Sequence, residues 1–167
     1  PKKDGNVYNS LAWGLIEKGE QLDKAVAWAK TGVELLKNPD VSAKPAYISQ
    51  RQWKKSNEMS LGMILDTYAF GLYQQGRTPE AEAAYEEAFT LTAGGQADVN
   101  QRLVECYVKN GKFDKAMMTA TDCIVKGKSN DKLVEAYKAA YVKVKGSESG
   151  FEAAIAKAKE TAKGDIK

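Results

Sequence analysis

The sequence predicts an all-α protein built from about four antiparallel helix pairs. Three observations favour this fold: apolar residues recur at helical spacing, only 4 of the 167 residues are proline, and a glycine-centred pattern repeats along the chain. A chain of this length is typical of one domain, expected over residues 1–167. The helix pairs are predicted over residues 6–37, 61–92, 97–127 and 130–163.

Small residues and glycines define each predicted pair. Two antiparallel helices approach closely only where side chains are small, so Ala69 should face Ala81 in the second pair. Glycine adopts left-handed backbone without steric cost, which predicts that Gly76 ends the first helix of this pair. Gly19 and Gly111 are expected to play the same part in the first and third pairs.

Helix starts are predicted from hydroxyl side chains and proline. Thr78 is interpreted as a cap, with Pro79 at the first helical position after it. Ser129 is interpreted as the cap of the fourth pair. That pair turns between residues 146 and 150 and lacks the alanine expected after the turn, so it is interpreted as a capping repeat.

Residues 38–60 separate the first two pairs and are interpreted as an insertion with one short helix. The stretch is polar and contains Pro39 and Pro45. It also holds Trp53, for which two placements stay open. This side chain either pins the insertion to the scaffold or forms an exposed anchor.

Charge is distributed unevenly, although the formal net charge is only +3. Residues 1–60 carry 10 basic and 7 acidic side chains, residues 61–108 carry 2 and 7, and residues 109–167 carry 13 and 8. The sequence therefore predicts an acidic middle that a partner could recognise. Only three of the 25 basic residues are arginine, which phosphate and base recognition favour, so no nucleic-acid partner is expected.

The sequence predicts no catalytic, metal-binding or cofactor-binding residue, and therefore no enzyme. It has no histidine, which removes Ser–His and Cys–His nucleophile pairs and most transition-metal sites. Cys106 and Cys123 form no CxxC pattern and are interpreted as buried helix residues. The carboxylates at residues 80, 82, 86 and 87 are interpreted as a solvated helix face rather than an acid–base pair.

No membrane-spanning segment is expected, because no apolar run approaches the roughly 20 residues that a membrane helix needs. The chain begins at Pro1 without an initiator methionine or a hydrophobic signal region. It stops at Lys167 directly after a helical pattern. We interpret it as a fragment of a longer protein.

Two neighbouring segments carry a family resemblance. The first, LDTYAFGLYQQGRTPEAEAAYEEAFTL, starts at Leu65, and the second, NQRLVECYVKNGKFDKAMMTATDCI, starts 35 residues later at Asn100. Their small, aromatic and glycine positions recur at a period of about 34 residues, which resembles the tetratricopeptide repeat. The resemblance implies a right-handed α-solenoid, interrupted by the insertion after its first pair, whose first helices line a concave groove.

Over nearly the whole chain, the sequence is also similar to the helical segment that precedes a thioredoxin-fold domain in some exported proteins of Bacteroides-like bacteria. This similarity is carried by Asp66-Thr67-Tyr68-Ala69 and by the turn from Gly146-Ser147 to Gly150-Phe151. It implies a periplasmic or otherwise exported scaffold within a larger thiol–disulfide protein. Redox activity is not expected of this chain, which has no CxxC.

The concave groove is the candidate binding site. Projecting the repeat register places nine residues there: Asn9, Trp13, Asp66, Phe70, Tyr73, Gln74, Gln101, Glu105 and Lys109. The three aromatic side chains would anchor a partner, while the amides and Asp66 would bond a peptide backbone. In the alternative interpretation, the aromatic side chains pack against the insertion or a neighbouring helix.

Two functions follow from these patterns. The first is a non-catalytic scaffold and protein-interaction domain that belongs to a larger thioredoxin-like protein. The alternative is an independent peptide-binding adaptor of the tetratricopeptide type. The expected partner is a protein or peptide in the groove, or an adjoining thioredoxin-fold domain.

Overall fold

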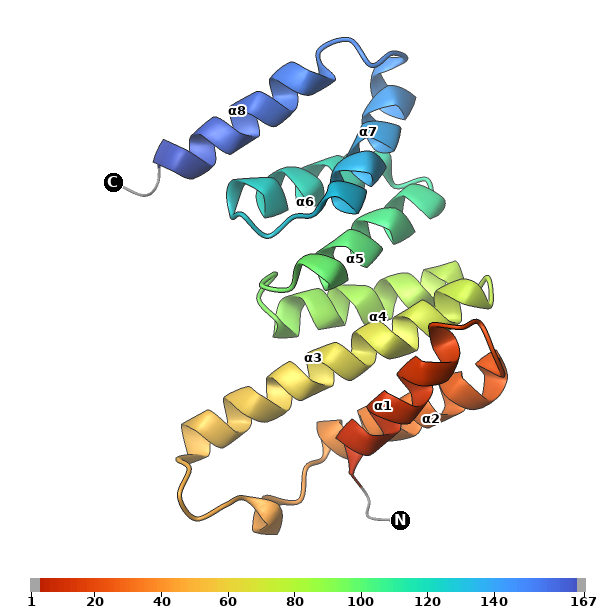
Figure 1. Cartoon of the computed structure of the whole chain (residues 1–167), viewed down its shortest axis with the longest axis vertical. Coiled ribbons are helices and arrows are strands. Elements are labelled where there is room, and N and C mark those ends of the chain that lie inside the picture. The colour runs from red at the N-terminus through yellow and green to blue at the C-terminus, as the bar shows by residue number, and fades with distance from the viewer. Residues whose placement is uncertain (1–3, 165–167) are drawn as a thin grey trace. The chain divides into compact units, whose positions relative to one another are not determined.

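The computed structural model describes residues 4–164, which contain helices and no strand. The predicted domain limits, at residues 1 and 167, lie outside the described residues. The helices are α1 (Gly5–Ile16), α2 (Leu22–Lys37), the short 3₁₀ helix η1 (Val41–Ala43), α3 (Gln50–Gln74), α4 (Thr78–Leu91), α5 (Ala97–Lys109), α6 (Phe113–Val125), α7 (Asp131–Lys145) and α8 (Phe151–Gly164) (Figure 1). The predicted all-α fold of helix pairs is confirmed.

The contacts divide the chain into two compact units, one ending at Ala93 and the other beginning at Gly94. In the first unit, α1 packs on α2, α3 packs on α4, and α3 also contacts α1 and α2. In the second unit, α5, α6 and α7 pack on one another and α8 packs on α6. That residues 1–167 form a single domain stays a prediction.

The predicted helix turns are confirmed. Gly19, Gly76 and Gly111 have φ values of 68°, 77° and 72°, the left-handed backbone that glycine adopts most easily. Ala69 and Ala81 are both fully buried, one on each of the packed helices α3 and α4. Both small side chains are therefore buried, as a close approach of the two helices requires.

Two of the predicted caps are wrong by one residue. Helix α4 begins at Thr78 itself, and Arg77 occupies the cap position, where its side chain makes no capping hydrogen bond. Helix α7 is capped by Asn130, whose side-chain oxygen accepts a hydrogen bond from the backbone N–H of Leu133 at 3.0 Å. Asparagine caps a helix as well as serine does, so Ser129 had an equivalent neighbour that the sequence pattern could not rank.

The predicted insertion is shorter than residues 38–60, because its second half is helical. Ser49 and Gln52 form a capping box in which each side chain accepts a hydrogen bond from the other residue's backbone N–H. Neither proline nor glycine occurs between Ser49 and Gly62, so the helix started by this box continues unbroken into the repeat. Residues 50–60 thus belong to α3, the long yellow helix of Figure 1.

The two tryptophans outside the predicted groove are both half-buried. Trp53 lines a cavity together with Leu36 and Pro39, which supports the alternative in which it pins this region to the scaffold. Trp28 packs against the core of the first unit, and the Lys24 Nζ lies 4.7 Å from its ring centroid.

Helix α8 closes the second unit by packing mainly on α6, and its first residue also contacts α7. The Phe151 ring lies 5.2 Å from the Tyr137 ring and 5.5 Å from the Tyr141 ring, measured between centroids. Phe151 and Ile155 are buried, as an inward-facing stripe requires.

Burial agrees with the prediction for the two cysteines and disagrees with it for one acidic residue of α4. Cys106 and Cys123 are buried, as predicted, and burial raises the pKa of Cys123 to about 11. Glu82 is only 5% exposed, so the interpretation of the carboxylates at residues 80, 82, 86 and 87 as a solvated face is wrong for Glu82. Glu80 forms an ion pair of 2.6 Å with Arg77, and the hydrogen bond in this pair lowers the pKa of Glu80.

Within residues 4–164, no helix is long and apolar enough to cross a membrane.

Candidate functional site

Trp13 and Phe70 form an aromatic contact between α1 and α3. Their ring centroids lie 5.9 Å apart with an interplanar angle of 34°. Both side chains are half-buried, and Phe70 also packs against the core of the first unit. The aromatic residues therefore pack against a neighbouring helix, as the alternative interpretation expected, while part of each ring stays accessible.

The polar residues predicted beside these rings have structural partners or are closed off from solvent. The Gln74 side-chain nitrogen donates a 2.8 Å hydrogen bond to the backbone oxygen of Ile16, where α1 ends. Asp66 is only 2% exposed, so its carboxylate is not accessible to a peptide. The side-chain oxygen of Asn9 is also buried. Tyr73 is half-buried and keeps an accessible surface.

The remaining predicted residues lie on α5, in the second unit. Gln101 donates a hydrogen bond to Glu105 at 3.0 Å and accepts one from Asn130 at 2.9 Å. Burial raises the pKa of the Glu105 carboxyl, while the Gln101 hydrogen bond and nearby positive charges act in the opposite direction. Lys109 is exposed at the end of the helix. The groove as one surface of nine residues stays a prediction, since these three belong to a different unit.

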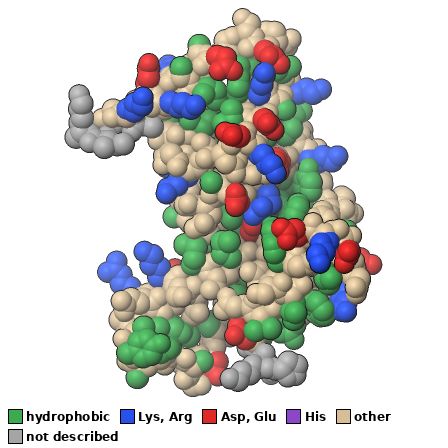
Figure 2. Space-filling model, in the orientation of Figure 1, with side chains coloured by type: hydrophobic (Ala, Val, Ile, Leu, Met, Phe, Trp, Pro, Cys, Tyr) green, Lys and Arg blue, Asp and Glu red, His purple; other side chains and the backbone are tan. Residues whose placement is uncertain are grey.

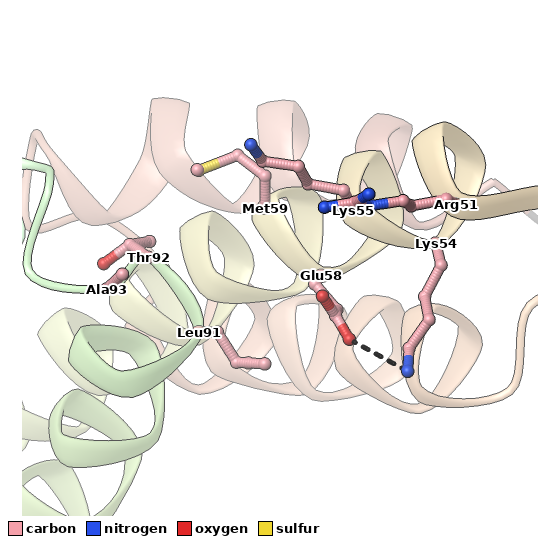
Figure 3. A pocket seen from close by; sticks show the side chains of 8 residues that line it. All are labelled: Arg51, Lys54, Lys55, Glu58, Met59, Leu91, Thr92 and Ala93. Atoms are coloured by element: carbon pink, nitrogen blue, oxygen red, sulfur yellow. Dashed lines mark ion pairs between the residues drawn. The ribbon is translucent and has the colours of Figure 1, made fainter.

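A second candidate site lies at the other end of α3. Its lining residues define what we call the basic cavity: Arg51, Lys54, Lys55, Glu58, Met59, Leu91, Thr92 and Ala93. The cavity has a volume of about 560 Å³ and lies between the beginning of α3 and the end of α4. Figure 3 shows Arg51 and Lys55 on one side of α3 and Lys54 reaching toward Glu58 on the other, at a distance of 3.8 Å. Basic side chains project from this end of α3 in the space-filling view (Figure 2).

Sequence reasoning missed the basic cavity because residues 38–60 were assigned to an insertion. A signal was present in the sequence. The capping pattern of Ser49 and Gln52 marks a helix start, and Arg51, Lys55 and Met59 follow at intervals of four residues. Read as a helix, this stretch places those three side chains on one face.

The part of the chain that the structure describes holds no cluster of three or more cysteine, aspartate or glutamate side chains arranged for a metal ion.

Comparison with known protein families gives a match over part of the chain. Residues 72–119 match the family model described as tetratricopeptide repeat, a stretch that covers the end of α3, all of α4 and α5 and the first half of α6. This segment is tetratricopeptide-like, as its helix pairs and glycine turns also indicate. No curated protein and no solved structure matches the chain.

Proposed function

We propose that this chain is a non-catalytic helical-repeat scaffold that binds protein partners. The observation that carries the proposal is the match of residues 72–119 to the tetratricopeptide repeat, on a chain whose described residues form packed helix pairs. Proteins of this family are generally non-catalytic and typically bind proteins or peptides.

The proposed contact surface in the first unit is the aromatic face formed by Trp13, Phe70 and Tyr73. Half-buried aromatic side chains are held in place by their packing and still offer apolar surface, a combination typical of binding anchors. Gln74 supports this face because its hydrogen bond to Ile16 ties α3 to the end of α1.

The aromatic face can be tested with tyrosine variants and a capture assay. We expect Tyr73→Ala to weaken capture of partner proteins about tenfold, the loss of roughly 1.4 kcal/mol of binding free energy. Tyr47→Ala is the matched control, because Tyr47 is 89% exposed and lies on the loop before α3. Equal capture by the two variants would contradict the aromatic face, provided that both melt like the unaltered chain.

The scaffold is further proposed to belong to a larger, exported, thioredoxin-like thiol–disulfide protein. The support is the resemblance described above, carried by Asp66-Thr67-Tyr68-Ala69 and by the turn from Gly146-Ser147 to Gly150-Phe151. The test is the reading frame that continues after residue 167. A strand pattern followed by CxxC would support this context, whereas a frame without either would favour the alternative, an independent peptide-binding adaptor.

A further inference from the structure

Some charged side chains of the first unit are paired within the unit, whereas the two basic side chains at the start of α3 are not. Glu87 pairs with Lys37 at 3.0 Å and Glu80 pairs with Arg77 at 2.6 Å. In contrast, Arg51 and Lys55 are exposed and form no ion pair with any described residue. The basic cavity therefore presents positive charge that no described carboxylate pairs with at Arg51 and Lys55.

The rest of the basic cavity does not cancel this charge. The only carboxylate in its lining, Glu58, faces Lys54. The end of α4, where helix carbonyls carry partial negative charge, is also satisfied internally. There the Thr92 hydroxyl donates to the Ala88 oxygen at 2.9 Å, and the Ala93 N–H donates to the Thr90 oxygen at 3.1 Å.

The spacing of three side chains along α3, two exposed and one half-buried, defines the shape of a ligand. Arg51, Lys55 and Met59 follow one another by four residues on α3, so their side chains stand about 6 Å apart on one face. Alternate residues of an extended peptide point to the same side at intervals of about 6.6–6.8 Å. Two carboxylates separated by one residue would therefore reach Arg51 and Lys55. The next side chain on that side would lie over Met59 and Leu91, which are apolar.

We infer that the basic cavity binds an extended acidic segment of a partner protein with the pattern acidic–any–acidic–any–apolar. This site lies on different residues from the aromatic face and goes beyond the proposed function. Its lining favours a peptide over a nucleic acid for three reasons. It contains one arginine, no aromatic ring on which a base could stack, and a carboxylate that a dense row of phosphates would approach.

Binding can be measured by fluorescence anisotropy with two labelled peptides of equal composition. One repeats the order Glu-Ser-Glu-Ser-Leu, and the other repeats Glu-Glu-Ser-Ser-Leu. We expect the first peptide to bind at least tenfold more tightly, with an affinity that falls as salt is raised. Equal affinity for the two orders would overturn the inferred spacing. Tighter binding of a single-stranded oligonucleotide would overturn the peptide as the ligand.

Charge-reversal variants locate the site. We expect R51E combined with K55E to weaken peptide binding at least tenfold. K157E combined with K159E makes the same change in net charge on exposed positions of α8 and should leave binding unchanged. Equal losses in the two variants would overturn the basic cavity as the site.

Two further variants separate this inference from folding defects and from the aromatic face. If the charge-reversal variant does not fold, R51Q with K55Q removes the same charges and should show the same loss. Tyr73→Ala should bind the peptide normally. A loss of peptide binding in that variant would overturn the inference and place the peptide on the aromatic face instead.

Discussion

Glycine acts at the residue scale in two ways that the sequence pattern does not distinguish. Gly76 is required for its backbone conformation, with φ of 77° and open space where a side chain would be. Gly32 is helical and is required for space, because a Cβ atom there would overlap the Cδ1 of Ile64 and lie 3.0 Å from the Cβ of Tyr8. This position lets α2 approach both α1 and α3.

We predict opposite effects of alanine at two helical glycines. Gly32→Ala should lower the free energy of unfolding by about 1–3 kcal/mol, since the added methyl group overpacks the contact with Ile64. Gly14→Ala should raise it by about 1 kcal/mol, because no heavy atom lies within 4 Å and alanine favours a helix. Urea unfolding followed by circular dichroism measures both changes. A Gly32→Ala variant as stable as the unaltered chain would contradict the close approach.

The Glu105 carboxyl predicts a pH-dependent contribution to stability. Burial raises its pKa in the folded protein above the ordinary value of 4.5, so the unfolded chain loses this proton first as pH rises. The folded state is therefore penalised at a pH above its raised pKa, and the penalty vanishes well below pH 4.5.

Glu105→Gln should stabilise the protein at neutral pH and have no such effect in acid. The glutamine oxygen can still accept the hydrogen bond from Gln101, so only the ionisable group is removed. The gain should stay below about 1 kcal/mol, because the carboxyl is partly exposed and screened by water. Thermal melts between about pH 3 and pH 8 measure it, with Glu152→Gln at an exposed position of α8 as the control. A stabilisation that persists unchanged into acid would refute the assigned cause.

At the scale of elements, the position at which α3 begins decides how much of the predicted insertion, residues 38–60, is helical. Its first part is mostly exposed, so it gains little from core packing and depends on local interactions. The capping box of Ser49 and Gln52 supplies two of these, and the exposed pair of Lys54 and Glu58 adds little. The basic cavity exists only if this part of the helix is formed.

Ser49→Ala should fray the beginning of α3 without unfolding the unit. Loss of the cap should cost about 1 kcal/mol locally and speed amide hydrogen exchange over residues 50–60. Ser49→Asn should preserve protection, because asparagine caps equally well. Ser56→Ala, at an exposed position in the middle of the same stretch, should increase protection instead. Unchanged exchange in Ser49→Ala would show that the cap does not hold this segment.

At the scale of the whole molecule, the first unit carries its own core. Ala12, Ile16, Ala25 and Ala29 are fully buried there, and its four α-helices pack on one another. In the second unit, hydrogen bonds from within the unit hold its first residues in place. The buried side chain of Asn100 donates hydrogen bonds to the backbone oxygens of Gly94 and Lys128, both at 2.9 Å.

A chain cut after Ala93 should therefore fold by itself. We expect residues 1–93 to give a helical circular dichroism spectrum and a cooperative thermal transition, because their core contacts lie within the unit. A control with Ile16→Ala should lose about 2–5 kcal/mol of stability, as a fully buried isoleucine requires. A broad, non-cooperative transition in the 1–93 chain would contradict this prediction.

Helical spacing and turn residues predicted the presence of the helix pairs better than they predicted the residue at which each helix begins. Helical spacing and glycine turns depend on neighbouring residues, which is why the turns at Gly19, Gly76 and Gly111 are confirmed. Proline and polar composition suggested a long insertion, but Trp53 and the capping box at Ser49 belong to a helix that the composition concealed. The predicted cap at Ser129 was wrong for a related reason. Ser129 and Asn130 are adjacent and cap a helix equally well, so only the backbone geometry shows that Asn130 is the cap.

The sequence by itself determined the helical class, the repeat and its turns, because these depend on spacing and backbone preference over a few residues. Only the tertiary structure decided which charges are available. Glu80 and Glu87 are neutralised by Arg77 and Lys37, whereas the basic residues at the start of α3 stay exposed. The acidic middle that composition suggested stays a prediction, and the structure adds a basic cavity that the charge count along the chain did not predict. The physical reason is that pairing and burial depend on contacts between helices, such as the one between Lys37 and Glu87, which lie 50 residues apart in the chain.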